Sequence, residues 1–181
     1  MRAEDCPDLL LDLDDATAQQ VFDAFDRLHL DGLPGAFDLG REEVEALYAA
    51  GHQLLGKGDL KRAREAFNFL VICESQDARF WTALAVVLHK QKDWPAAIDA
   101  YSMAALLDAT NVRLYFHAAE CLMQSRDWPR AQQSLEAFFR VSDNVYGKDQ
   151  SKIRQFIDKA EAWQRIIDAK VSAQARPHDR T

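Results

Sequence analysis

The chain has 181 residues, 48% of them hydrophobic, which is enough for a domain with a core and excludes bulk disorder. Its formal net charge of −7 argues against a nucleic-acid-binding surface, and only 7 Gly and 5 Pro favour long helices over a turn-rich β fold. Residues 1–45 hold 13 acidic and 3 basic residues, so the acidity lies in this N-terminal part.

The three cysteines, Cys6, Cys73 and Cys121, are far apart and form no C-x-x-C pair. The lack of such a pair excludes zinc and redox motifs, and we expect no metal centre and no cofactor. Cys73 and Cys121 lie in apolar helical context, which predicts small buried thiols and fits a reducing compartment. No apolar run reaches the roughly 18 residues that a membrane span needs. The acidic start lacks the basic residues of a signal peptide, so we expect a cytoplasmic protein.

The first predicted helix runs from Asp15 to Leu30, within an acidic N-terminal segment of residues 1–43. Its apolar stripe packs either on the repeats that follow or on a second subunit, which makes it a candidate dimer interface. The stripe consists of Val21, Phe22, Phe25 and Leu28.

Next, a pattern recurs every 34 residues. It is marked by Ala63, Ala97 and Ala131, each preceded by an aspartate four residues earlier. This period is the length of a tetratricopeptide (TPR) unit, a pair of antiparallel helices. We therefore predict an all-α fold with three tandem TPR repeats, at 44–77, 78–111 and 112–145.

Small residues occupy the eighth position of each repeat, at Gly51, Ala85 and Ala119. We expect the two helices of a unit to cross closely there, because a large side chain would hold them apart. After the repeats, residues 149–170 form one more amphipathic pattern. It predicts a helix that covers the apolar face of the last repeat, within a C-terminal cap and tail of residues 146–181.

Within the repeats, Phe116-His117-Ala118-Ala119-Glu120-Cys121-Leu122 resembles the third-repeat signature of the class II chaperones of bacterial type III secretion. The resemblance to this family covers roughly residues 44–142, because stretches of the first two repeats match it as well. The matching stretches are Leu47-Tyr48-Ala49-Ala50-Gly51, Gly58-Asp59-Leu60, Ala63 to Phe67, Ala78-Arg79-Phe80-Trp81, Ala97-Ile98-Asp99-Ala100-Tyr101 and Leu107-Asp108.

The resemblance implies a cytoplasmic chaperone that holds the hydrophobic, pore-forming translocator proteins until export. It implies three TPR repeats behind an N-terminal helical segment, and a groove that binds an extended client segment. Members of the family also dimerise through N-terminal helices. This chain departs from the family pattern at His52 and Leu55, where aromatic residues are common.

In a TPR the first helices line the concave surface, and positions 2, 5, 9 and 12 of each unit point into it. We call these residues the groove positions, and we expect specificity to be led by Tyr48 and Phe116, whose truncation should spare folding. Their mixture of apolar and polar side chains suits an extended peptide. The groove positions are Glu45, Tyr48, His52, Leu55, Arg79, Thr82, Val86, His89, Arg113, Phe116, Glu120 and Met123.

The other function classes are weaker. His52, His89 and His117 lack a further ligand at a recognised metal spacing, and the carboxylates Glu45 and Glu120 have no accompanying nucleophile or oxyanion motif. We therefore expect no enzyme activity. The alternative function is a TPR scaffold or regulatory adaptor that joins protein partners without chaperone activity.

Overall fold

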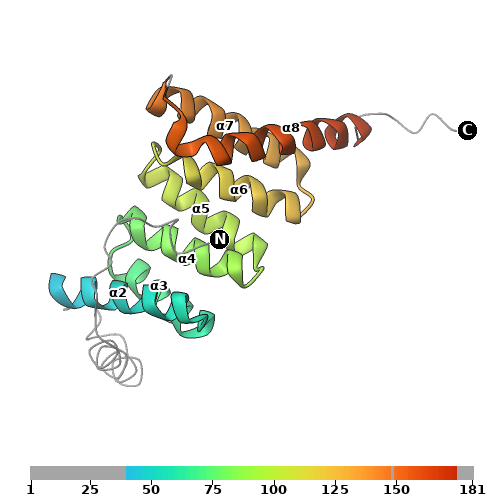
Figure 1. The fold of residues 1–181 in the computed structure, drawn as a ribbon. Helices are drawn as coiled ribbons and strands as arrows, with labels where there is room; N and C mark the ends of the chain where they lie inside the picture. The colour runs from blue at the N-terminus through green and yellow to red at the C-terminus, as the bar shows by residue number, and fades with distance from the viewer. Residues whose placement is uncertain (1–39, 148, 175–181) are drawn as a thin grey trace, which may run out of the picture. The chain divides into compact units, whose positions relative to one another are not determined.

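The computed structural model describes residues 40–147 and 149–174, and every regular element in these ranges is helical (Figure 1). This confirms the all-α prediction, with three helix pairs followed by a C-terminal helix. The expected N-terminal helix and its stripe Val21, Phe22, Phe25 and Leu28 lie outside the described residues. The helices are α2 (Arg41–Lys57), α3 (Leu60–Cys73), α4 (Ala78–Lys90), α5 (Trp94–Leu107), α6 (Val112–Gln124), α7 (Trp128–Tyr146) and α8 (Arg154–Gln174), with a 3₁₀ turn η3 (Ser151–Ile153) before α8.

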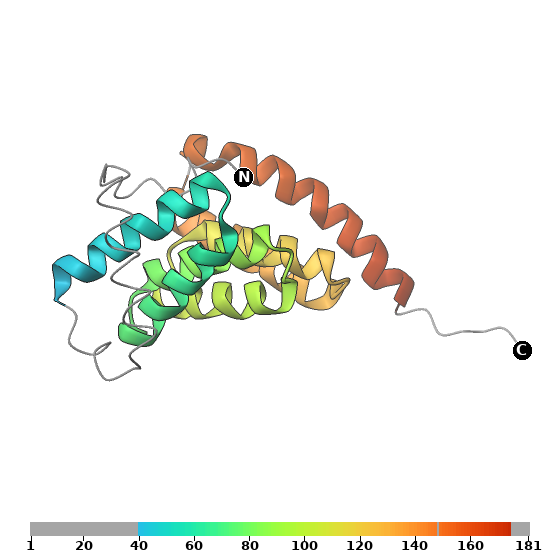
Figure 2. The ribbon, with the colours of Figure 1, turned by 90° about the horizontal axis from the view of Figure 1, so that it is seen from below.

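The chain divides into two compact units, Met1–Gln91 and Lys92–Thr181. In the first unit α3 packs on both α2 and α4, and α2 also contacts α4. In the second unit α6 packs on α5 and α7, while α8 packs on α7 and reaches α6. Figure 2 follows α8, in red, as one continuous helix to the end of the described residues. Each unit is thus a sequential stack of helices.

The core is built on the small residues that the repeat pattern predicted. Ala63, Ala97 and Ala131 are fully buried, as are Ala85 and Ala119 at the eighth position. In the first and third repeats this burial accompanies the packing of α2 on α3 and of α6 on α7, where only a small side chain lets two helix backbones approach closely.

Gly51 shows the same steric rule most clearly. A Cβ atom built on this residue of α2 would lie 2.7 Å from Cε1 and 2.8 Å from Cζ of Phe67 in α3. The Phe67 side chain is itself fully buried, so it has no solvent-filled space into which it can move. The α2–α3 crossing therefore requires glycine at this position.

The turn inside each repeat uses one left-handed residue at the same place, position 15. It is Gly58 in the first repeat (φ 83°), Lys92 in the second (φ 61°) and Arg126 in the third (φ 60°). A left-handed conformation costs a non-glycine residue roughly 1–2 kcal/mol. The second and third repeats carry this strain, and the first avoids it.

Aspartates begin the second helix of each pair. Asp59 accepts a hydrogen bond from the backbone N–H of Arg62, and Asp127 accepts one from that of Arg130, both at 3.2 Å. These bonds satisfy backbone donors that the first turn of a helix leaves open. Asp93 holds the equivalent place before α5 but makes no such cap bond.

The C-terminal helix covers the last repeat, as predicted. Its inward side buries Phe156, Ile157, Ala160 and Ile167, and η3 buries Ile153. This face replaces the neighbour that a further repeat would supply. None of the helices in the described ranges is both long and apolar enough to span a lipid bilayer.

Two of the three cysteines, Cys73 and Cys121, fall in the described ranges, and neither forms a disulfide there. Cys121 is buried, as expected, and burial raises the pKa of its thiol to about 12. Cys73 is half-buried at the end of α3, and its pKa is also raised, chiefly by burial. Raised pKa values keep both groups protonated and weakly nucleophilic at neutral pH.

Candidate functional site

The groove positions are accessible to different degrees. Ten of the twelve are half-buried, whereas Tyr48 is only 4% exposed and Phe116 only 2%. Half-buried side chains on the first helix of each pair are what a binding surface needs, since they are held by neighbours and still meet solvent. Tyr48 and Phe116 belong instead to the core.

In the first unit, an ion pair joins equivalent positions of two successive repeats. The guanidinium of Arg79 in α4 donates to both carboxylate oxygens of Glu45 in α2, at 2.8 and 3.2 Å. It also donates to Asp77, at distances from 2.7 to 3.2 Å. These hydrogen bonds, first to Asp77 and then to Glu45, raise the pKa of Arg79. The pair fixes α2 against α4 at the edge of the site.

The same guanidinium lies over two aromatic rings. Its central carbon is 5.3 Å from the ring centroid of Tyr48 and 5.4 Å from that of Phe80. The Tyr48 and Phe80 rings are themselves 5.3 Å apart. Arg79 thus joins a polar edge to an aromatic cluster, and its donors are engaged within the protein.

His52 completes this cluster one turn further along α2. Its ring meets Tyr48 edge to face at 4.5 Å and Phe67 at 5.3 Å. Burial lowers the pKa of His52 to about 4, so the imidazole is neutral at physiological pH. Its Nε2 is buried and accepts or donates no hydrogen bond within the described residues. His52 therefore acts as an aromatic packing residue with an unsatisfied polar atom.

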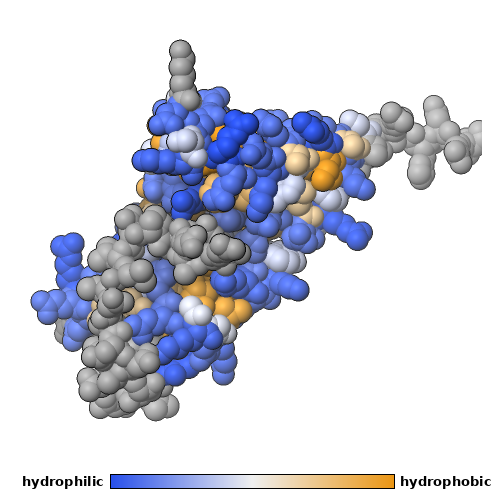
Figure 3. All heavy atoms as spheres, in the orientation of Figure 1, coloured by the Kyte–Doolittle hydropathy of each residue, from blue (hydrophilic) through white to orange (hydrophobic). Residues whose placement is uncertain are grey.

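The remaining groove positions of the first unit are Leu55, Thr82, Val86 and His89, all half-buried. The hydroxyl of Thr82 donates to the backbone carbonyl of Ala78 at 2.7 Å, so its hydrogen is used inside α4. Leu55 and Val86 present apolar surface. The face of the molecule drawn in Figure 3 is largely hydrophilic, with small apolar patches. Leu55 and Val86 are the apolar contacts among these four groove positions.

In the second unit, α8 closes over Phe116. The ring of Trp163 stacks on Phe116 at 4.6 Å with an interplanar angle of 21°, and Phe156 meets it edge to face at 4.9 Å. On the opposite side Phe138 lies 5.7 Å away. Phe116 is therefore enclosed by the cap helix and α7.

Polar groove positions flank this aromatic cluster. Nδ1 of His117 lies 3.4 Å from a carboxylate oxygen of Glu120, and the Arg113 guanidinium carbon lies 5.6 Å from the Phe156 ring centroid. Met123, one turn beyond Glu120 on α6, is half-buried. The accessible part of this unit's site is thus Arg113, Glu120 and Met123.

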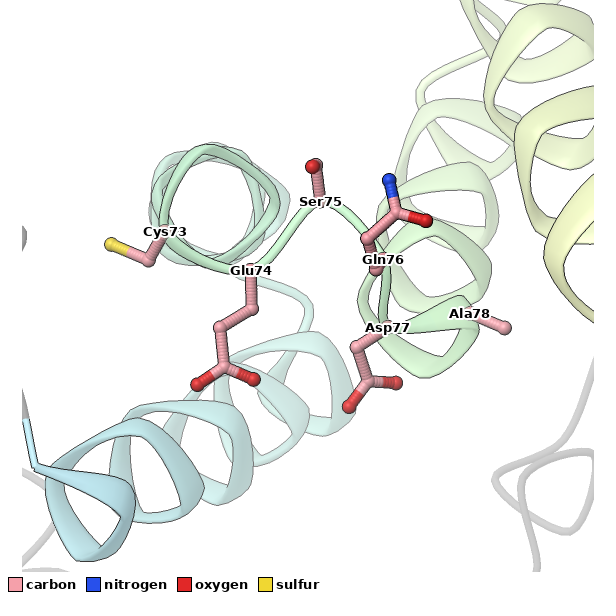
Figure 4. A pocket seen from close by; sticks show the side chains of 6 residues that line it. All are labelled: Cys73, Glu74, Ser75, Gln76, Asp77 and Ala78. Carbon is pink, nitrogen blue, oxygen red and sulfur yellow. The ribbon is translucent and has the colours of Figure 1, made fainter.

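A separate open hollow of about 540 Å³ lies along the loop from α3 to α4 (Figure 4). Glu74 and Asp77 point to one side of this loop, whereas the thiol of Cys73 points away from them. Asp77 already forms an ion pair with Arg79, so its carboxylate serves to hold the first unit together, and we do not assign the hollow to the binding site.

The structure brings Tyr48, His52 and Arg79 together and encloses Phe116 separately. The expectation that truncating Tyr48 or Phe116 would spare folding is wrong, because removing a buried aromatic ring costs about 3–5 kcal/mol. Trp163 is a further partner of the site that the repeat pattern does not single out. Its helical spacing from Phe156 and Ile167 on the cap was the available signal, since these residues share one face.

Comparisons with known proteins agree with this geometry. A tetratricopeptide-repeat family model matches residues 48–113. No curated protein sequence matches the chain significantly.

Solved structures match over most of the fold. The Yersinia enterocolitica type III secretion chaperone SycD, solved with a peptide of the translocator YopD, is 23% identical with a TM-score of 0.66, covering 72% of this chain and 96% of that one. PcrH of Pseudomonas aeruginosa, solved with the chaperone-binding region of PopD, is 26% identical with a TM-score of 0.65, covering 73% and 96%. The TPR2B domain of yeast Sti1, in a complex with pHsp70, is 25% identical with a TM-score of 0.57, covering 66% and 97%. Residues 48–113 therefore match the tetratricopeptide repeat, and the chain shares its fold with the type III secretion translocator chaperones SycD and PcrH.

Proposed function

We propose that this protein is a cytoplasmic type III secretion chaperone that binds hydrophobic translocator proteins and keeps them stable before export. The observation that carries the proposal is the match to SycD and PcrH over 96% of their chains, both solved with translocator segments bound. The third-repeat stretch Phe116 to Leu122 supports it from the sequence.

The mechanism is binding without turnover. An extended client segment would place its apolar side chains against half-buried groove positions such as Leu55, Val86 and Met123. Polar groups such as Glu120 would meet its backbone. Covering the apolar segment lowers its tendency to associate prematurely with other chains or with membranes.

Dimerisation is part of the proposal. The stripe Val21, Phe22, Phe25 and Leu28 has the helical spacing of a self-association surface, and one SycD structure is described as an alternative dimer. The stripe is the proposed contact between two copies of this chain.

The alternative function is an adaptor that joins folded partners. The similarity to the Sti1 TPR2B domain supports this alternative. That match has the lower TM-score, 0.57 against 0.65 for PcrH. Client solubility separates the two functions, because only a chaperone should change it.

The test is co-expression with two hydrophobic translocator proteins from the source organism, chosen by sequence. Both should become more soluble, and at least one should co-purify with the protein. Val86→Glu, which places a charge at a half-buried groove position of α4, should weaken co-purification. Asn68→Glu adds the same charge at an exposed position of α3 and serves as the control. Unchanged solubility of both translocators, with neither co-purifying, would overturn the proposal.

A further inference from the structure

A second hollow, of about 190 Å³, opens in the second unit between α5, α6 and the start of α7. Its floor includes the buried side chains of Ile98 and Leu122. The other lining residues are Pro95 and four polar residues, Asp99, Ser125, Asp127 and Arg130.

The first unit fills the equivalent place with its own side chains. Gln91 lies 34 residues before Ser125, and its Nε2 donates to the backbone carbonyl of Leu60 at 3.0 Å. Arg64 lies 34 residues before Ile98, and its NH1 donates to Oε1 of Gln91 at 3.3 Å. An arginine and a glutamine therefore bridge this inter-helix groove in the first unit.

The second unit cannot form that bridge. Ser125 is too short to reach across the groove, and Ile98 has no donor in place of the guanidinium. The remaining volume corresponds to about six water molecules at roughly 30 Å³ each, which is room for one long side chain. The second unit thus leaves open the place that Arg64 and Gln91 occupy in the first unit.

The charges among the lining residues favour a cation. Asp99 is exposed, and its carboxylate makes no hydrogen bond or ion pair within the described residues. Asp127 accepts the capping hydrogen bond from the backbone N–H of Arg130 at 3.2 Å, and its second carboxylate oxygen lies 3.6 Å from the guanidinium of Arg130, whose side chain is 57% exposed. The lining thus carries two carboxylates and one guanidinium, a net negative charge.

We propose that this hollow is a docking site for an arginine side chain of a partner protein, which takes the place that Arg64 fills in the first unit. The aliphatic part of the arginine would lie on Ile98 and Leu122, and its guanidinium would pair with Asp99. None of the lining residues is a groove position, so the site goes beyond the proposed function and stands or falls separately.

The test uses the full ¹⁵N-labelled chain titrated with three capped tripeptides, Ala-X-Ala, in which X is arginine, norleucine or glutamate. The arginine peptide should shift the amide signals of Ile98, Ser125 and Asp127 in a saturable way. Norleucine carries an aliphatic stem without the charge, so it loses the ion pair. We expect it to bind at least about fivefold more weakly than the arginine peptide. Equal binding of the norleucine or glutamate peptide would overturn the proposal.

Variants locate the site. Asp99→Asn should weaken arginine-peptide binding by about fivefold without changing the melting temperature, whereas Glu136→Gln, an equal charge change at an exposed position of α7, should have no effect. Ile98→Arg combined with Ser125→Gln rebuilds the bridge of the first unit and should abolish binding. Wild-type affinity in the double variant would overturn the proposal. If the double variant does not fold, wild-type affinity of Asp99→Asn for the arginine peptide would overturn the proposal instead.

Discussion

Replacing Gly51 with alanine tests whether steric contact sets the α2–α3 crossing. Alanine in a helix interior is about 1 kcal/mol more favourable than glycine, so propensity alone predicts stabilisation. The packing predicts the opposite, because the new Cβ would lie 2.7 Å from Cε1 of Phe67. The two effects have opposite signs, so the measurement decides between them.

The magnitude follows from the contact. Carbon atoms pack at about 3.5–4.0 Å, so the Phe67 ring or the helix must move by roughly 1 Å. The ring is fully buried and contacts Tyr48 and His52, which leaves no free direction. Overpacking of this kind costs about 1–3 kcal/mol, so after the helix gain of about 1 kcal/mol Gly51→Ala should lose up to about 2 kcal/mol. For a chain of this size that corresponds to a melting temperature up to about 8 °C lower.

The assay is urea unfolding followed by circular dichroism, with two comparisons. Gly56→Ala, also in α2, places its Cβ where no atom lies within 4 Å, and it should stabilise the protein slightly. In a Phe67→Leu background the clash is absent, so Gly51→Ala should become neutral or stabilising. An identical loss in both backgrounds, or stabilisation by Gly51→Ala alone, would refute steric control of the crossing.

Three further predictions concern pH, the turns and the alanine positions. The pKa of His52 is about 4 in the folded state, below the value of 6.5 in the unfolded chain. Between pH 6.5 and pH 4 the unfolded chain therefore binds more protons than the folded protein, so the free energy of unfolding falls as the pH drops through this range. The loss is about 2 kcal/mol at pH 5, and His52→Phe should remove it; an unchanged difference between urea midpoints at pH 7 and pH 5 would contradict this. Lys92→Gly relieves the strain of the left-handed backbone at this turn and should be neutral or slightly stabilising. Lys92→Val should lower the free energy of unfolding by about 1–2 kcal/mol in the same urea assay, and equal effects of the two variants would count against strain at the turn. Ala97→Trp inserts a large side chain at a fully buried position and should abolish cooperative unfolding, so a native-like melting curve would be the contrary result.

The repeat pattern predicted the helices and their crossings well, because both depend on local spacing. Gly51 and Ala63 could be assigned to the α2–α3 crossing from their positions alone. The strained turn at Lys92 was not predictable, since nothing in a lysine indicates a left-handed backbone.

The site was harder to predict because burial depends on elements outside the repeat. Phe116 occupies a groove position, yet Trp163 and Phe156 of α8 enclose it. The ion pair of Arg79 with Glu45 joins two separate repeats, and each residue alone reads as an ordinary surface charge. Repeat spacing shows which helix face a residue occupies but not what covers that face.

The binding of hydrophobic translocator proteins is tested by a quantitative pull-down from the native cell, with bound proteins identified by mass spectrometry. If the protein binds these clients, the most enriched partners should carry long apolar, membrane-inserting segments, and they should be lost in the Val86→Glu variant but retained in Asn68→Glu. Enrichment of soluble, folded proteins alone, equally retained by both variants, would contradict client binding.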